Sequence, residues 1–242
     1  MILKATAALW LVVALAGCHE TTHPVVARTS DPVVARTYWG NKPDTYVLPT
    51  SEDTGQAVTT KGGATGLIAS GLLTMNAPSS GGAGLYRVFD AGEPITRIGA
   101  RFTLGSRVRG TTASGAIGLV MMNHDYNPND PTMRLSVHVY VGATNWGLQS
   151  KINGVWSYYA TGKFTPPLKI DSTVYTAEIY RVGDTVTIVL PNGQVSATTN
   201  STFAPCNWGY VETAMTAPTD NIPGILENWW DTGEQHPPAP RS

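Results

Sequence analysis

Residues 174–195 read VYTAEIYRVGDTVTIVLPNGQV, two short apolar segments separated and followed by turn-forming residues. The segments at 174–182 and 185–190 are rich in Val, Ile, Tyr and Thr, which are enriched in strands. Gly and Asp at 183–184 separate the segments, and Pro-Asn-Gly at 191–193 follows them. Short runs of this composition joined by a two-residue Gly-containing link predict a β-hairpin and then a further turn.

The same pattern extends along the chain on both sides of this hairpin. Residues 96–104 and 133–141 alternate apolar and polar side chains, which indicates strands that are half buried. Residues 115–123, GAIGLVMMN, predict a strand buried on both faces, and Asn153-Gly154 is a strong hairpin signal. No helical spacing persists after the amino-terminal segment. The sequence therefore predicts an all-β protein, a two-sheet antiparallel jelly roll or β-sandwich.

Composition excludes several classes of function. Charged residues make up 14% of the chain and the formal net charge is -1, whereas a nucleic-acid-binding protein needs a basic face. We therefore expect no nucleic-acid partner. The chain also lacks the Gly-x-Ser-x-Gly, His-Glu-x-x-His and phosphate-loop motifs of common enzyme classes.

The amino terminus has the features of an export signal. Lys4 precedes an uncharged run at 5–17, which is shorter than the roughly 20 apolar residues that span a bilayer. The run ends in Leu15-Ala16-Gly17-Cys18, which resembles the lipobox of bacterial lipoproteins. That resemblance implies cleavage before Cys18, lipidation of its sulfur and acylation of the new amino group, for example with palmitate. It implies a cell-membrane anchor facing the extracytoplasmic side; the alternative is a secreted protein with an incidental cysteine.

These signals divide the chain into four parts. Residues 1–17 are the predicted signal peptide, and residues 18–45 a flexible tether that contains the unit PVVART twice. Residues 46–232 are the predicted β-sandwich domain. The Pro-rich residues 233–242 are a predicted tail.

Three stretches together resemble concanavalin A-like lectin/glucanase domains, including laminin-G-like ones. They are FDAGEPITRIGARFTL at 89–104, WGLQSKINGVW at 146–156 and the hairpin at 174–195, and ILENWWDT at 225–232 resembles the closing strand. The resemblance implies a concanavalin A-like sandwich. That family includes lectins, adhesive modules and glycoside hydrolases, so the fold leaves the activity open.

Acidic residues on the predicted strands are isolated. Retaining glycosidases place two carboxyl groups about 5 Å apart, and the glucanase branch of the family carries them as Glu-x-Asp-x-x-Glu on one strand. This chain has no such run; Glu178, Glu212 and Glu227 each stand alone. We therefore assign no catalytic residue, and a divergent enzyme using Glu178, Glu212 or Asp125 remains the alternative.

The loop NHDYNPNDP at 123–131 is rich in oxygen donors. Asp125, Asn127 and Asp130 are ligands of the type that calcium prefers, and legume lectins carry a loop of similar character beside the sugar site. We therefore predict calcium as a possible cofactor here. The competing explanation is that Asn, Asp and Pro gather because turns favour them.

Aromatic side chains gather around the Asn153-Gly154 turn. Trp146, Trp156, Tyr158 and Tyr159 form this group, and rings of this kind stack on the apolar faces of sugars. We predict that they bind a ligand. Alternatively, Trp146 and Trp156 pair across the hairpin and stabilise the sheet.

The leading hypothesis is thus a lipid-anchored, non-catalytic β-sandwich protein that binds a glycan or a cell-envelope polymer. The second hypothesis is a polysaccharide-cleaving hydrolase or lyase with the same fold. The third is a structural envelope lipoprotein without a small ligand.

Overall fold

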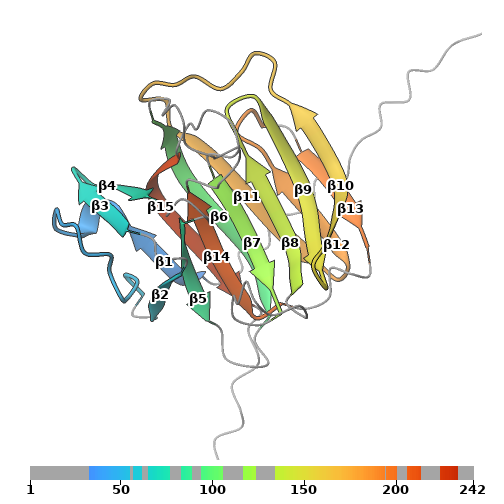
Figure 1. The fold of residues 1–242 in the computed structure, drawn as a ribbon, viewed down its shortest axis with the longest axis horizontal. Coiled ribbons are helices and arrows are strands. Elements are labelled where there is room, and N and C mark those ends of the chain that lie inside the picture. The colour runs from blue at the N-terminus through green and yellow to red at the C-terminus, as the bar shows by residue number, and fades with distance from the viewer. Residues whose placement is uncertain are drawn as a thin grey trace, which may run out of the picture. The chain divides into compact units, whose positions relative to one another are not determined.

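The computed structural model has the predicted all-β architecture, two antiparallel sheets that enclose one core (Figure 1). It describes residues 33–54, 57–61, 65–76, 83–88, 94–105, 117–123, 134–193, 195–200, 206–213 and 224–233. Within these ranges no helix is long and apolar enough to cross a membrane. The predicted lipidation site Cys18, the calcium ligands Asp125, Asn127 and Asp130, and the tail after residue 233 lie outside them.

One sheet has eight strands, ordered β13-β12-β11-β6-β15-β4-β3, with β1 also paired to β15. Their bounds are Val195–Thr199 (β13), Thr185–Val189 (β12), Tyr175–Val182 (β11), Ile95–Leu104 (β6), Gly224–Gly233 (β15), Leu72–Asn76 (β4), Thr65–Ala69 (β3) and Val33–Tyr38 (β1). In Figure 1 the last strand, β15 (red), lies between β4 and β6, so the strand that resembles a closing strand is central in its sheet.

The other sheet has seven strands, ordered β10-β9-β8-β7-β14-β5-β2. Their bounds are Val155–Lys163 (β10), Asn145–Ile152 (β9), Arg134–Val141 (β8), Ile117–Met122 (β7), Trp208–Thr213 (β14), Ala83–Val88 (β5) and Val58–Lys61 (β2). Among the described residues the only helical element is the 3-10 turn η1, Trp39–Asn41. Every strand pair is antiparallel.

The core lies between the inner faces of the two sheets. Alternation in β6 places Ile98, Ala100 and Phe102 in this core, as predicted. All six residues of β7 are buried, which confirms the prediction of a strand covered on both faces. Period-two patterning thus determines which side of each sheet faces inward.

The predicted hairpins form where the sequence places them. Ile152 pairs with Val155 across Asn153 and Gly154, whose φ angles are 51° and 80°. Positive φ at both central positions matches the right-handed twist of the strands that the turn joins. Val182 likewise pairs with Thr185 across the 183–184 link.

The predicted boundary between tether and domain differs from the structure. The tether was expected to reach residue 45, but β1 already pairs with β15 from Val33 onward, and Trp39 is buried in the core. Both sheets belong to a compact unit that begins at Asp31. The proline of the second PVVART copy immediately precedes β1, a position at which a strand tolerates proline.

Candidate functional site on the outer face of the seven-stranded sheet

A row of side chains crosses five strands of the seven-stranded sheet on its outer face, the face turned away from the core. Tyr210, Val120, His138, Gln149 and Tyr158 are successive partners in the strand register from β14 to β10. Residues directly opposite one another in antiparallel strands share a face and lie within contact range. The register therefore brings together side chains from positions far apart in the sequence.

The neighbouring row contains two glycines that leave room above the sheet. Glu212, Gly118, Tyr140 and Gly147 are successive partners. A Cβ atom at Gly147 would lie 2.4 Å from Cε1 of Tyr140, so the Tyr140 ring lies directly over this glycine. Gly118 has no side chain to separate Glu212 on β14 from the residues of β8.

His138, Gln149 and Glu212 form a buried polar cluster. The Gln149 amide Nε2 lies 3.0 Å from His138 Nδ1 and donates to it, which leaves the proton of the neutral imidazole on Nε2. His138 Nε2 lies 3.7 Å from Glu212 Oε2, too far for a hydrogen bond, and has no hydrogen-bond partner in the described part of the chain. The alternating pattern at 133–141 puts His138 on the polar side of its strand, but the side chain is only 4% exposed because neighbouring side chains cover it.

Burial disfavours the charged form of both ionisable groups in this cluster. Burial raises the pKa of Glu212 to about 7, although a hydrogen bond from Tyr210 opposes the shift. Burial also lowers the pKa of His138 to about 4. At neutral pH the imidazole is therefore neutral and the carboxyl group is close to its midpoint, so the short separation does not create an ion pair.

Two of the predicted aromatic residues, Trp156 and Tyr158, are exposed beside this cluster. Their side chains are 41% and 64% exposed on β10, the edge strand. The Trp156 ring lies 5.7 Å from the His138 ring, and Lys151 Nζ lies 5.6 Å from the centre of the Trp156 ring. These contacts hold the indole in place while leaving part of it open to a ligand.

The other two predicted aromatic residues face inward. Trp146 is 3% exposed and belongs to the core, where its ring lies against Gly162. Tyr159 is partly buried against the core, and its hydroxyl bonds Ser150 Oγ at 2.9 Å. A buried ring offers no face to a ligand, so the ligand-binding prediction for Trp146 is wrong, and Tyr159 has a packing role. Trp146 and Trp156 are not cross-strand partners, because their partners are Gly162 and Lys151.

Two of the isolated acids lie in the other sheet and have local partners. Glu178 Oε2 accepts a hydrogen bond from Trp230 Nε1 at 3.1 Å, and Glu227 lies 3.1 Å from Arg101. Glu178 and Glu212 belong to different sheets, so they cannot meet across paired strands. Across the described ranges we find no group of three or more His, Cys, Asp or Glu side chains arranged to hold a metal ion.

The sequence considered alone presents Glu212 as an isolated acid and does not bring His138, Gln149 or Tyr140 together with it. The available signal was their outward position on alternating strands. The register that unites them involves strands β7, β8, β9 and β14, which contact one another through long-range pairing that local patterns do not encode.

The fold is an all-β jelly-roll sandwich of two antiparallel sheets, similar to that of lectin-like and carbohydrate-binding domains. Solved structures with a similar fold are lectin-like and carbohydrate-binding domains. No protein-family model matches the sequence, and no protein with a curated description matches it.

Three solved structures illustrate the likeness. The calcium-bound VIP36 exoplasmic/lumenal domain aligns with a TM-score of 0.53 and 6% identity over 85% of this chain and 91% of that one. Its calcium- and mannose-bound form gives 0.52 and 8% over 80% and 91%. The CBM2 module of the evolved Dit of Lactobacillus casei BL23 phage J-1 gives 0.50 and 11% over 85% and 97%. At these identities the likeness concerns the fold, not the activity.

Proposed function

We propose that this protein binds a glycan on the outer face of its seven-stranded sheet and is held at the cell membrane by lipid on Cys18. The observation that carries the glycan proposal is the exposure of Trp156 and Tyr158 two residues apart on one strand, beside a buried polar cluster. Sugars present apolar C–H faces and hydroxyl edges, which match rings next to hydrogen-bonding groups. Carbohydrate-bound structures among the folds that resemble this one support the ligand class.

Each group has a part in this binding mode. The rings of Trp156 and Tyr158 stack on the sugar, and His138 and Lys151 hold the Trp156 indole. The unpartnered His138 Nε2 and the Glu212 carboxyl are buried on the same face, where a hydroxyl group could bond them only if the covering side chains shift.

A glycan array probed with the full chain tests this proposal. We expect Trp156→Ala and Tyr158→Ala each to weaken binding about tenfold or more, since stacking on one aromatic ring contributes on the order of 1–3 kcal/mol. Tyr46→Ala is the matched control, because Tyr46 is 81% exposed and lies outside this face. We call the surface formed by Trp156 and Tyr158 the platform. Unchanged binding by the folded Trp156→Ala protein would reject the platform. An array with no bound glycan would favour the structural envelope protein.

The lipid anchor rests on the four residues that end the uncharged run, Leu15 to Cys18. Each buried methylene adds about 0.8 kcal/mol, and stable anchoring takes more than one chain. Mass spectrometry of the native polypeptide should find its amino terminus at Cys18 with acyl chains attached. An intact and unmodified first segment would overturn the anchor, and Cys18→Ser should release the protein from membranes.

A calcium ion at 123–131 belongs to the same proposal. The donor set of Asp125, Asn127 and Asp130 fits calcium, which prefers oxygen ligands; the VIP36 domain is known in a calcium-bound form. Calcium should raise the melting temperature of the wild type and not of Asp125→Asn. An equal response of the two proteins would reject the site.

A polysaccharide-cleaving activity is the second candidate, and one observation favours it. A carboxyl group with a pKa of about 7 remains partly protonated at neutral pH, as a general acid requires. Glu212 would be that acid, beside the neutral His138. Release of reducing sugar or of unsaturated ends from polysaccharides by the wild type but not by Glu212→Gln would establish this activity; absence of product from both would leave binding alone.

A further inference from the structure

Two depressions adjoin on the outer face of the eight-stranded sheet, opposite in the sandwich to the platform described above. Their volumes are about 470 and 430 Å³, and Tyr38 and Glu227 line both. The first is lined mainly by polar side chains, and the second by glycines, small polar side chains, Leu72 and Val174. Together they form one groove that passes on either side of the Tyr38 ring.

A β-bulge in β15 builds the floor of this groove. Leu226 pairs with Phe102 and Asn228 pairs with the adjacent Arg101, so Glu227 is an extra residue on β15. The bulge turns both Glu227 and Asn228 toward the first depression, whereas strict alternation would send one of them into the core. Such bulges re-aim side chains, and this one concentrates two hydrogen-bonding groups at one place.

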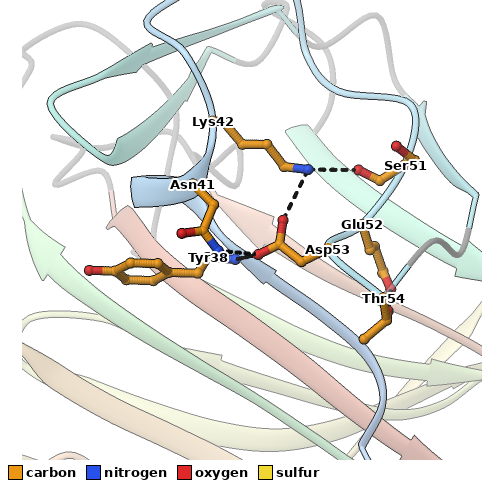
Figure 2. Close-up of polar contacts among 7 residues, drawn as sticks. All are labelled: Tyr38, Asn41, Lys42, Ser51, Glu52, Asp53 and Thr54. Atoms are coloured by element: carbon orange, nitrogen blue, oxygen red, sulfur yellow. Dashed lines mark hydrogen bonds and ion pairs between the residues drawn. The ribbon is translucent and has the colours of Figure 1, made fainter.

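The wall of the groove is held by Asp53. Its carboxylate accepts hydrogen bonds from the Tyr38 backbone N–H at 2.9 Å and from Asn41 Nδ2 at 3.0 Å, and it lies 3.0 Å from Lys42 Nζ (Figure 2). Lys42 also donates to the carbonyl of Ser51. The segment around Asp53 is thereby tied to β1 and η1, and the groove is preformed on this side.

The Tyr38 ring is positioned as a stacking surface. Figure 2 shows the ring directed away from Asp53, and it is 40% exposed. A Cβ atom at Gly40 would lie 2.6 Å from Tyr38 Cε1, so the ring lies over this glycine. The absence of a side chain at Gly40 therefore sets the position of the ring.

Asn228 provides an independent sign of a ligand. It is 7% exposed and lines the first depression, and its Oδ1 has no hydrogen-bond partner among the residues that the structure describes. A buried amide oxygen without a donor costs free energy. This oxygen is itself closed to solvent, so a ligand hydroxyl reaches it only after the Asn228 amide turns toward the depression.

The charges around the groove are balanced. Arg101 lies 3.1 Å from Glu227, and Lys42 lies 3.0 Å from Asp53. Paired charges of both signs attract neither an anion nor a cation strongly, but they offer donors and acceptors together. A hydroxyl group, which both donates and accepts, is the ligand group that fits this arrangement.

We propose that these two depressions form a second carbohydrate-binding groove, which takes a neutral oligosaccharide lying across the Tyr38 ring. The ring stacks on one sugar unit, Arg101 and Glu227 bind its hydroxyls, and the Asn228 amide turns to accept from a hydroxyl in the deeper part. The next unit extends past the Tyr38 ring into the second depression, toward Leu72 and Val174. This site shares its ligand class with the platform around Trp156 but uses none of its residues.

Calorimetry with the full chain and neutral tetrasaccharides of β-1,4-linked glucose, xylose, mannose and N-acetylglucosamine tests the groove. In the Trp156→Ala background we expect one remaining binding event for at least one sugar. Adding Tyr38→Ala should weaken it at least tenfold, and Gly40→Ala should weaken it by displacing the ring. Tyr38→Phe should retain it, because the ring remains. Tyr46→Ala is the control, and thermal melting verifies that each variant is folded.

The outcomes separate the two sites. Loss of all binding in Trp156→Ala alone, or unchanged binding on adding Tyr38→Ala, overturns the groove and leaves the platform standing. Loss of binding in Tyr38→Ala alone with a neutral Trp156→Ala supports the groove and rejects the platform. No heat from any of the four sugars with the wild type also overturns the groove, while the platform is still judged by the wider glycan array.

Discussion

Glu212 and His138 lie 3.7 Å apart in a setting that penalises charge on both. The folded-state pKa of Glu212, about 7, lies above its ordinary value of 4.5, so ionisation of this carboxyl costs stability as pH rises between those values. The folded-state pKa of His138, about 4, lies below 6.5, so its protonation costs stability as pH falls between those values. The two effects offset each other over much of the mildly acidic range.

Replacing Glu212 with Gln isolates one of them. The amide cannot ionise but can still accept a hydrogen bond from Tyr210, so the penalty above pH 7 disappears. At pH 8 we expect the free energy of unfolding of the variant to exceed that of the wild type by about 3 kcal/mol. At pH 4.5 we expect the two free energies to differ little. Urea unfolding at the two pH values measures this. A variant less stable than the wild type at pH 8 would show instead that Glu212 is an ionised, well-paired carboxylate.

At this scale the sequence predicted residue types better than residue positions. Trp156 and Tyr158 were grouped with the other rings around the Asn153-Gly154 turn, and both are exposed on β10. Position near the turn did not separate them from Trp146, which lies on the inward face of β9 and belongs to the core. The adjacency of His138 and Glu212 follows from register across three strands, which no local pattern contains.

Among the elements, the β9–β10 hairpin is the one that the sequence predicts most directly. Asn-Gly at the tip adopts the two positive φ angles that such a turn requires. The strand β1 is the opposite case: its proline-containing repeat suggested a tether. Its strand conformation depends on its partner β15, which lies nearly two hundred positions later in the sequence.

Substitution of Gly154 tests the turn. No atom lies within 4 Å of a Cβ at this position, so Gly154→Ala meets no steric obstacle, but its φ of +80° is unfavourable for an L-residue. We expect a loss of about 1 kcal/mol in the free energy of unfolding and a smaller loss for Gly154→Asn. Urea denaturation measures both; equal stability of Gly154→Ala and the wild type would mean that the turn relaxes to another type.

The contrasting substitution is Gly147→Ala in the same hairpin. Here the obstacle is the Tyr140 ring, 2.4 Å from the added Cβ, so the ring must move. Overpacking of this kind costs about 1–3 kcal/mol. We expect greater destabilisation than in Gly154→Ala, together with a change in ligand binding at the platform.

Truncation tests the element boundary at β1. Removal of residues 1–30 keeps β1, whereas removal of 1–38 deletes a strand paired to β15 and the chain that leads into the buried Trp39. We expect the shorter deletion to leave the melting temperature unchanged and the longer one to lower it by at least about 5 °C. Equal melting temperatures would show that residues 33–38 do not stabilise the domain, as expected of a tether.

For the whole molecule, stability comes from the apolar layer between the sheets. Phe102 is fully buried there, so Phe102→Ala should cost about 3–5 kcal/mol. Val182→Ala, at a position 67% exposed, should change stability by less than about 0.5 kcal/mol. Chemical denaturation of the two variants compares them directly, and similar losses would contradict a single core between the layers.

The two outer faces then serve as separate surfaces on one scaffold. The architecture was predictable because alternation and turn residues act locally. The groove on the eight-stranded sheet was not, because the bulge at Glu227 reverses the expected side of Asn228. The proposed groove thus lies where strand pairing departs from regularity, and sequence patterns describe only the regular part.

The central place of β15 has a consequence for biosynthesis. The last strand in the sequence fills the gap between β4 and β6 and supplies the partner of β1. A nascent chain still attached to the ribosome therefore exposes open edges on three strands until Gly233 emerges. The two-sheet structure can therefore close only after β15 has left the ribosome, and a chain that stops before β15 leaves β1, β4 and β6 without this partner.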